Sequence, residues 1–597
     1  MDDQNKNLIL ATVLSFLVIL VWFVLFPPEE PATDPNAPVT AQDALTPPAE
    51  QAATADGVPV TAEAQPEAPR VAIDSPRLTG SISLSGGRID ELLLRGYPET
   101  LDEGADIVPL LQPQGNGGAF YAVYGWTPGG ALDFDDVPGA NTTWELASGG
   151  TLGPDSPVTL RWDNGAGLVF TREIALDDDY MFTVTQRVEN RTDAPVTLRP
   201  YGQIARHGEP QDLQNFFILH EGVLVMADGT LTETSYSKMR DLRMSEVERV
   251  PAESTQVTGN GWVGFTDKYW MATLIPMPGD AFTAVRKYVP GSDVFLTEAR
   301  HETVTVAPGA SVESASRLFA GAKEWETIRG YQRNLGIDRF VDSIDWGWFF
   351  FLTKPMFAVL HWLNGVIGNM GVAIIALTLL LKAVLFPLAY KSYVSMARMK
   401  ELQPEMEALK ERVGDDRQKM QQEMMKLYKE KKVNPAAGCL PILLQIPIFF
   451  SLYKVIFVTI ELRHAGFFGF LQDLSAPDPT SIFNLFGLLP WSAPDPASIM
   501  ALVFIGVMPI LLGVTMWLQQ KLNPAPTDKT QAMIFAWMPW VFMFILGGFA
   551  SGLVLYWITN NVITFAQQYI IMRSHGHKPD LFGNMTAGLR KKKPAAK

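Results

Sequence analysis

The sequence predicts a polytopic α-helical membrane protein with a large all-β domain outside the membrane. Two observations lead to this fold class. Six stretches of the chain are apolar over a length suited to crossing a bilayer. Between the first and the second stretch lie about 260 residues of short, partly alternating segments rich in Val, Thr and aromatic residues, a pattern typical of antiparallel β-sandwiches.

The two halves of the chain differ in charge. Residues 1–345 contain 24 Lys and Arg against 49 Asp and Glu, a balance of −25. Residues 346–597 contain 24 against 14, a balance of +10, and the two balances give the net charge of −15. This asymmetry predicts an acidic exported domain joined to a basic membrane domain that meets anionic lipid or RNA. The single cysteine, Cys439, excludes an intrachain disulfide and a cysteine-rich metal site.

The N-terminal part is expected to form an anchor and a tether. Residues 1–26 contain a long uncharged run that ends at Pro27 and Pro28 rather than at a small-residue cleavage site, so we interpret them as a retained transmembrane helix. Residues 27–70 consist largely of Pro, Ala and acidic residues. They bury too little apolar surface to fold, which predicts a disordered linker.

Residues 71–335 are predicted to form the β-sandwich. Short strands separated by turn residues are expected at 78–84, 158–162, 168–174, 180–188 and 196–201. His207 and Glu209 have the chemistry of an acid–base pair. Neither a nucleophile nor metal-ligand spacing accompanies them, so we interpret them as a solvated loop pair.

Residues 336–368 are unusually rich in aromatic side chains, including Trp346, Trp348 and Trp362. Aromatic residues gather at membrane–water interfaces, and this segment directly precedes an expected span. We therefore expect an amphipathic helix lying in the headgroup region. A buried core helix is the alternative for this composition.

The most informative stretch is the transmembrane helix expected at 369–390, because it contains one full charge, Lys382. A charge at membrane depth costs at least a few kcal/mol, so such a residue usually faces a water-filled cavity and marks a functional site. Thr378 lies one turn earlier on the same helix face. The alternative is that Lys382 extends its ammonium group to the nearer interface without a role in function.

The remaining chain is expected to alternate between membrane and water. A helical hairpin at 391–437 shows apolar residues at helical spacing among many charges. Further transmembrane helices are expected at 438–462, 498–519, 531–549 and 551–569. The basic hairpin, the 520–530 loop and the basic tail 570–597 then lie on one side, which the positive-inside rule makes cytoplasmic together with both termini. The β domain and the 463–497 loop lie on the other side.

A series of short motifs in the C-terminal half resembles the YidC family of membrane protein insertases. The motifs occur in family order: Asp345-Trp346-Gly347-Trp348, Gly368-Asn369, Phe386-Pro387-Leu388, Leu402-Gln403-Pro404, Gly414-Asp415-Asp416, Val433-Asn434-Pro435, Gly438-Cys439, Gln445-Ile446-Pro447-Ile448, Glu461-Leu462-Arg463 and Ser551-Gly552-Leu553-Val554-Leu555-Tyr556. The acidic half is similar in layout to the periplasmic β supersandwich, like that of sugar mutarotases, found in Gram-negative members of the family.

The resemblance implies a function and a site. Members of this family insert newly made inner-membrane proteins, alone or with the Sec translocon, through a core of five helices. These helices enclose a hydrophilic groove that is open to the cytoplasm. A basic residue in the groove, here Lys382, receives the acidic or polar N-terminal segment of the substrate. Carried onto this chain, the groove is lined by Thr378, Gln445 and Tyr556 or Trp557. The apolar part of the substrate leaves along Met533, Met538 and Met543.

Three residues depart from the family pattern. Lys382 stands where arginine is expected, which keeps the charge and loses the bidentate fork of arginine. Trp557 stands where a second tyrosine is expected. Lys454 lies at a position expected to be uncharged, and we expect its side chain to extend towards the periplasmic interface.

The resemblance also implies partners. The basic cluster Arg590, Lys591, Lys592 and Lys593 in the tail suits ribosomal RNA or anionic lipid headgroups. No cofactor and no metal are implied, and no enzyme is expected, because insertion makes and breaks no bond. Two other classes remain open on the sequence: a secondary transporter, and a membrane-anchored periplasmic protein that acts on carbohydrate.

Overall fold

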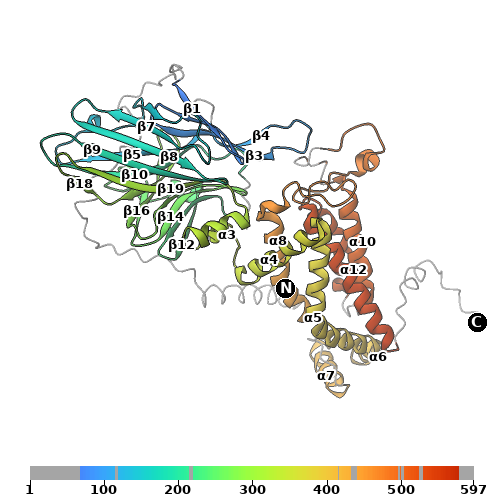
Figure 1. Cartoon of the computed structure of the whole chain (residues 1–597). Coiled ribbons are helices and arrows are strands. Elements are labelled where there is room, and N and C mark those ends of the chain that lie inside the picture. Colours follow the sequence, from blue (N-terminus) through green and yellow to red (C-terminus); the bar gives the residue numbers. More distant parts are fainter. Residues whose placement is uncertain are drawn as a thin grey trace, which may run out of the picture. The chain divides into compact units, whose positions relative to one another are not determined.

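The computed structural model of the chain describes residues 68–114, 118–213, 219–414, 416–431, 440–494, 498, 500, 503–523 and 529–576 (Figure 1). The expected N-terminal helix at 1–26, nearly all of the linker at 27–70 and the basic cluster at 590–593 lie outside the described residues.

The acidic half folds into two antiparallel sheets, which confirms the all-β prediction. The first sheet runs in the order β1 (Arg70–Asp74), β2 (Leu78–Ser83), β3 (Arg88–Pro98), β5 (Phe120–Gly129), β10 (Val196–His207), β17 (Val294–His301), β16 (Phe282–Val289) and β13 (Ala252–Val257), with β4 (Ile107–Leu111) on β3 and β18 (Val304–Val306) on β10. The second runs in the order β12 (Thr230–Ser235), β11 (Gly222–Ala227), β14 (Gly261–Thr266), β15 (Trp270–Pro276), β19 (Ser311–Ala322), β9 (Met181–Asn190), β8 (Leu168–Leu176), β7 (Val158–Asp163) and β6 (Glu145–Ser148).

The two sheets pack face to face around an apolar core, and one buried cation links them. Arg172 on β8 is almost fully buried and donates to the carbonyl of Gly87 at 2.9 Å and to that of Tyr124 on β5. Its guanidinium lies 4.5 Å from the ring centre of Trp144. Burial lowers the pKa of Arg172 to about 10. Main-chain carbonyls rather than a carboxylate accept from its two terminal nitrogens, while its Nε has no partner in the described part of the chain.

A short helical connection joins the sandwich to the C-terminal helices. Helix α3 (Trp325–Asn334) and the 3₁₀ turn η3 (Phe340–Ser343) lead into α4 (Phe350–Ile367). Helix α4 buries Phe357 and Leu360, whereas Trp362 on its other face is 63% exposed. This two-faced packing fits an amphipathic helix better than a fully buried one. The helix ends at Gly368, which adopts a left-handed φ of 74° and donates to the carbonyl of Asn364.

The described C-terminal part is mainly helical, with a stretch of loops and 3₁₀ turns between Val458 and Val507. Its helices are α5 (Met370–Glu401), α6 (Gln403–Val413), α7 (Arg417–Glu430), α8 (Leu440–Val458), α10 (Val507–Leu522), α11 (Lys529–Leu546) and α12 (Ser551–Ser574). Helix α12 packs against α5 and α10, while α4 packs against α5 and α8. Two helical segments, Phe350–Ile367 and Met370–Met399, are long and apolar enough to cross a membrane, and Gln445–Val458 and Met533–Leu546 are shorter apolar helices.

Helices α6 and α7 form the hairpin that the charge pattern predicts. Lys431 pairs with Glu405 at 2.6 Å, and Tyr428 lies against Met406, so the two arms run side by side. The hairpin is shorter than expected, because α5 continues without a break to Glu401 and takes up the first part of the predicted segment.

Within the segment expected as a helix at 498–519, the continuous helix α10 begins at Val507, after a helical turn in which the N–H of Phe504 donates to the carbonyl of Met500. The N–H of Val507 donates to Thr480 Oγ1 at 2.9 Å, and the N–H of Met508 donates to Asp478 Oδ2 at 2.7 Å. These contacts satisfy donors that every helix start leaves open. Asp478 belongs to the first copy of a repeated pentapeptide, Ser-Ala-Pro-Asp-Pro at 475–479, so this copy caps a helix as well as making a turn.

The same loop holds two further helix starts. The carbonyl of Ala476 accepts from the N–H of Ser551 at 2.7 Å, at the beginning of α12. The carbonyl of Phe467 accepts from the side-chain amide of Asn369 at 3.0 Å, directly before α5. Residues 467–480, which we name the capping loop, therefore fasten the N-terminal ends of α5, α10 and α12.

Candidate functional site

A cluster of polar side chains from three helices surrounds Lys382. The ammonium group of Lys382 on α5 donates to Thr564 Oγ1 on α12 at 2.9 Å and to Gln445 Oε1 on α8 at 3.4 Å. The amide nitrogen of Gln445 in turn donates to the hydroxyl of Tyr556 on α12 at 2.5 Å. The structure thus brings together Lys382, Gln445 and Tyr556, three of the residues that the sequence singled out.

The charge of Lys382 has only neutral partners here. Both hydrogen bonds of its ammonium group go to uncharged oxygens, and no ion pair of the described residues involves Lys382. The side chain is half-buried between apolar helices. A cation in such surroundings attracts an incoming carboxylate more strongly than one in bulk water does, because the local dielectric constant is lower.

Helix α12 contributes a polar stripe that extends along its length. Tyr556, Asn560, Thr564 and Gln568 follow one another at intervals of four residues, so they share one face of the helix, and all four are buried. Asn560 Oδ1 has no hydrogen-bond partner within the described part of the chain. A buried oxygen without a partner is costly, so this stripe is suited to a donor from water or from a bound segment.

Thr564, the nearest partner of Lys382, is not among the groove residues that the sequence predicts. The signal that could have found it is the four-residue spacing from Tyr556 through Asn560. Thr378, which we expected near Lys382, is buried, and its hydroxyl donates to the carbonyl of Ile374 in its own helix at 2.7 Å.

Trp557 lies on a different face from its neighbour Tyr556. Its ring stacks against Phe449 of α8 at 4.5 Å between ring centres, and against Phe542 of α11 at 6.4 Å. Of the two candidates for facing Lys382, the structure therefore brings Tyr556 into the cluster, and Trp557 packs among aromatic rings.

The three methionines of α11 differ in exposure. Met533 is exposed and Met538 is partly exposed. Met543 is buried, and its sulfur lies so close to Gly513 of α10 that a Cβ atom there would clash with it. Only Met533 and Met538 are thus accessible to a segment that moves along the outside of α11.

Lys454, which was expected to extend towards the periplasmic interface, has a buried ion-pair partner that the sequence did not indicate. Its ammonium group is buried and lies 2.6 Å from a carboxylate oxygen of Asp345, just before α4. The same oxygen of Asp345 also accepts from the N–H of His220, in the β domain, at 2.9 Å. Lys454 therefore links α8 to the β domain, and its charge is compensated by a partner distant in sequence.

The other candidate groups show no catalytic arrangement. Glu209 pairs with Arg240, while His207 lies 3.4 Å from the hydroxyl of Tyr121, so the two are not partners of each other in a reactive pair. Within the described residues, no group of three or more His, Cys, Asp and Glu side chains could hold a metal ion.

A large β domain followed by helices that keep a cation among polar side chains, with apolar surface outside, defines an integral membrane protein with a polar site between its helices. Two family models match the chain in consecutive parts. The model of the YidC periplasmic domain matches residues 70–359, and the model of the 60Kd inner membrane protein matches residues 362–578.

Relatives match the chain over its whole length. Membrane protein insertase YidC of Dinoroseobacter shibae is 68% identical over 100% of both chains. That of Cereibacter sphaeroides is 67% identical over 100% of this chain and 97% of its own. The chain belongs to the YidC family of membrane protein insertases. A crystal structure titled as an active YidC insertase with its first transmembrane domain resolved covers 94% of this chain and 99% of its own, at 18% identity and a TM-score of 0.34.

Proposed function

We propose that this chain inserts newly made proteins into the bacterial inner membrane, and that Lys382 receives the acidic or polar segment that must cross. The observation that carries the proposal is the uncompensated ammonium group of Lys382 among neutral polar side chains at membrane depth. A structural lysine at this depth would be expected to have a carboxylate partner, as Lys454 has in Asp345.

The polar stripe lowers the barrier that a substrate tail must cross. Moving an unpaired polar group into hydrocarbon costs several kcal/mol. Hydroxyl and amide groups of Thr564, Asn560 and Gln445 provide hydrogen bonds part of the way into the membrane and shorten that path. An acidic side chain of the tail then exchanges its water for the ammonium group of Lys382.

The apolar segment of the substrate leaves sideways along α11 in this proposal. Met533 and Met538 are accessible there, and thioether side chains adapt to many shapes. The membrane potential contributes about 2.3 kcal/mol per charge per 100 mV to the transfer of a charged tail. No step makes or breaks a covalent bond, so the chain acts as an insertase and chaperone rather than as an enzyme.

The topology we propose places both termini and the α6–α7 hairpin in the cytoplasm and the β domain in the periplasm. This arrangement puts the basic hairpin, the 520–530 loop and the tail on the side that positive residues favour. Nascent inner-membrane proteins and membrane lipids are the direct partners, with the Sec translocon as a further partner.

The central test compares Lys382→Ala with Lys382→Arg in cells depleted of the wild-type protein. We expect Lys382→Arg to keep insertion of a substrate with an acidic N-terminal tail and Lys382→Ala to reduce it at least tenfold, because only the alanine removes the charge. A substrate whose tail is neutral should be affected much less. Equal insertion of the acidic-tailed substrate by Lys382→Ala and wild type would remove Lys382 from the mechanism.

We also propose that the tail contacts ribosomal RNA. The cluster at 590–593 begins about 20 residues beyond the expected last span, with several Gly and Pro between, so it can reach away from the membrane. Removal of residues 589–597 should weaken co-sedimentation with ribosomes and flatten its dependence on salt, because fewer counterions are released. Unchanged co-sedimentation at every salt concentration would leave lipid as the partner of the tail.

A further inference from the structure

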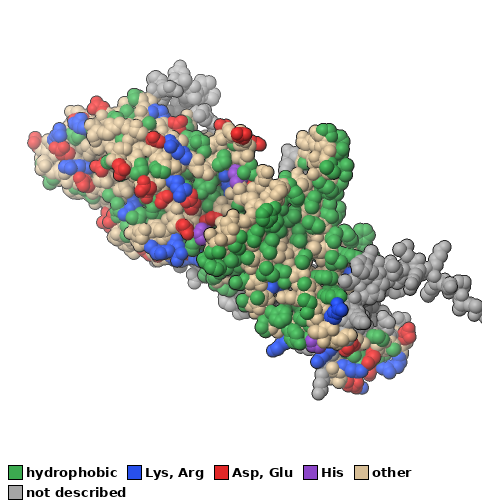
Figure 2. Space-filling view, turned by 45° about the vertical axis from the view of Figure 1, so that its right-hand side comes forward, with side chains coloured by type: hydrophobic (Ala, Val, Ile, Leu, Met, Phe, Trp, Pro, Cys, Tyr) green, Lys and Arg blue, Asp and Glu red, His purple; other side chains and the backbone are tan. Residues whose placement is uncertain are grey.

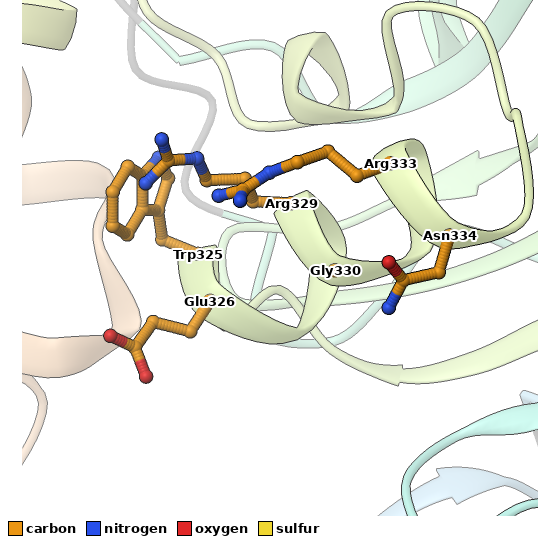
Figure 3. A pocket seen from close by; sticks show the side chains of 6 residues that line it. All are labelled: Trp325, Glu326, Arg329, Gly330, Arg333 and Asn334. Carbon is orange, nitrogen blue, oxygen red and sulfur yellow. The ribbon is translucent and has the colours of Figure 1, made fainter.

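The junction between the β domain and α4 contains a basic pocket on helix α3. The pocket has a volume of about 200 Å³ and is lined by Trp325, Glu326, Arg329, Gly330, Arg333 and Asn334 (Figure 3). A side chain at Gly330 would meet no neighbour, so the floor of the pocket is open to a ligand of moderate size.

Two positive charges lie on one side of this pocket. Figure 3 shows the side chains of Arg329 and Arg333 extending in the same direction, towards Trp325, while Glu326 points to the other side of the helix. The guanidinium carbon of Arg329 lies 4.7 Å from the ring centre of Trp325, which holds it in place. The positive potentials of the two guanidinium groups add on this side of the helix, which favours an anion there.

The nearby acidic group does not balance these charges. Glu326 is 2.9 Å from the ring nitrogen of His361 on α4. Both arginines are exposed, and neither forms an ion pair with any residue in the described parts of the chain. The pocket therefore carries a local excess of positive charge, although residues 1–345, to which it belongs, are acidic as a whole.

The pocket borders the helix that we place at the membrane surface. Trp325 contacts Phe357 and His361 of α4 at 5.6 and 5.3 Å between ring centres. Directly after His361, Trp362 is exposed, as is Val366 one turn later. A lipid whose acyl chains lie beside the exposed face of α4 would thus have its headgroup within reach of Arg329 and Arg333.

We propose that this pocket binds the phosphate of an anionic phospholipid in the outer leaflet of the inner membrane. Arginine presents paired N–H donors that match two oxygens of a phosphodiester. A zwitterionic headgroup would bring its own cation next to two guanidinium groups, which favours an anionic headgroup such as phosphatidylglycerol. The proposal rests on the membrane-surface position of α4 and not on insertion through Lys382.

Headgroup photolabelling of the full-length chain in lipid nanodiscs tests this proposal. A phosphatidylglycerol with a diazirine on its headgroup is compared with a phosphatidylcholine labelled at the equivalent position, and labelled peptides are mapped by mass spectrometry. We expect the anionic probe to label the α3 peptide several-fold more than the zwitterionic probe. The paired variant Arg329→Gln, Arg333→Gln should bring this labelling down to the level of the zwitterionic probe.

Two control variants distinguish specific binding at α3 from nonspecific attraction of anionic lipid to exposed arginines. The variant Arg243→Gln, Arg249→Gln removes two exposed arginines of the loop between α2 (Tyr236–Arg240) and β13 that form no ion pair in the described residues, and it should leave labelling of α3 unchanged. The variant Arg329→Lys, Arg333→Lys keeps the charges and should keep most of the preference for the anionic probe. Soluble glycerol phosphate should not compete at the concentration of the lipid phosphate.

Three results would overturn the proposal. Equal labelling by the two probes would mean that α3 is merely near the membrane. Full competition by glycerol phosphate would make the pocket a site for free phosphate esters. Absence of label from both α3 and α4 would place α4 away from the headgroups. Each of these results is independent of the effect of Lys382→Ala on insertion.

Discussion

The β domain and the helical region both bury charged groups, but a four-residue cluster in the β domain balances its own charges, whereas Lys382 in the helical region has only neutral partners. In the β domain, Glu248, Lys287, Glu298 and Arg300 are all buried and form ion pairs of 2.5 to 3.1 Å with one another. In the helical region, Lys382 is surrounded by neutral oxygens. A balanced buried charge stabilises a fold, whereas an unbalanced one costs stability and is retained where a ligand completes it.

The surfaces of the two regions differ in polarity: the β domain is charged outside and the helical region is apolar outside. Figure 2 shows charged side chains distributed over the β domain, and hydrophobic side chains gathered over the helices. Val384 on α5 and Ile570 on α12, for example, are 70% and 64% exposed. Such continuous apolar surface requires a nonpolar surrounding. The comparison identifies water as the solvent of the first region and lipid as the solvent of the second.

The largest effect is expected from removing the buried cation that joins the two sheets of the β domain. Replacement of Arg172 by Leu leaves the carbonyls of Gly87 and Tyr124 buried without their donor. We expect the free energy of unfolding of the β domain to fall by about 3 kcal/mol. The measurement is the thermal loss of the β-sheet infrared band of the full-length protein in detergent.

Arg187→Leu is the matched control for this change, because Arg187 is exposed and its partners Glu313 and Ser311 lie at the surface. It should shift the β-sheet transition very little. An Arg172→Leu variant that melts with the wild type would show that the buried cation is not needed to join the sheets.

His301 on β17 should make the free energy of unfolding depend on pH, with a maximum loss similar to the effect of Arg172→Leu. Burial, with a smaller contribution from the nearby charge of Arg199, lowers the pKa of His301 to about 4. Since the unfolded chain takes up the proton near pH 6.5, stability is fully present above that pH. It is lost as the pH falls towards 4, by at most about 3 kcal/mol.

The pH effect is measured as the unfolding temperature of the β domain between pH 7.5 and pH 4.5. His301→Gln should flatten the acid side of this profile, while His575→Gln, at an exposed position of the helical region, should not. Identical profiles for wild type and His301→Gln would contradict the prediction.

In the helical region, we expect a smaller effect on insertion, which should differ between Thr564 and Thr378. Thr564→Val removes the nearest oxygen partner of Lys382, and we expect insertion of an acidic-tailed substrate to fall about fivefold, equivalent to about 1 kcal/mol. Thr378→Val should change it little, because that hydroxyl bonds only within its own helix in the described structure.

A neutral-tailed substrate provides the control for Thr564 as a positioning residue. Its insertion should fall much less than that of the acidic-tailed substrate, since only the latter uses the oriented ammonium group. Equal losses for both substrates would mean that Thr564→Val acts through stability of the bundle.

The smallest effect is expected where the two regions meet. Arg463 donates to the carbonyls of Pro98 and Glu99 at 2.7 and 3.2 Å, and Glu461 accepts from the N–H of Trp325 at 3.1 Å. Arg463→Ala should speed amide hydrogen exchange at Glu99 and Thr100 about threefold, equivalent to about 0.6 kcal/mol, without changing exchange inside either region. Unchanged exchange at these two residues would show that this junction is held elsewhere.

The sequence predicted those features that depend on local patterns. Alternation of apolar residues placed β7 and β8 within a few residues of their observed positions, and a charge inside an apolar run identified Lys382. The pairing of Lys454 with Asp345 could not be foreseen, because hydropathy assigns a cation to water unless its partner is known. The start of α10 at Val507 was missed because the groups that cap it, Asp478 and Thr480, lie in a loop that is distant in sequence. Thr564 was missed because a hydroxyl is tolerated throughout an apolar helix.

The capping loop at 467–480 fixes one end of the bundle through directional contacts. It ties the starts of α5, α10 and α12 through Asn369, Asp478 and Ser551. At the opposite ends, the same three helices meet through apolar packing, since Ala397 of α5, Leu522 of α10 and Met572 of α12 form one buried cluster. Hydrogen bonds require a set distance and angle, whereas apolar contacts are non-directional. The end of the bundle opposite the capping loop is therefore the end that can repack around segments of different shape.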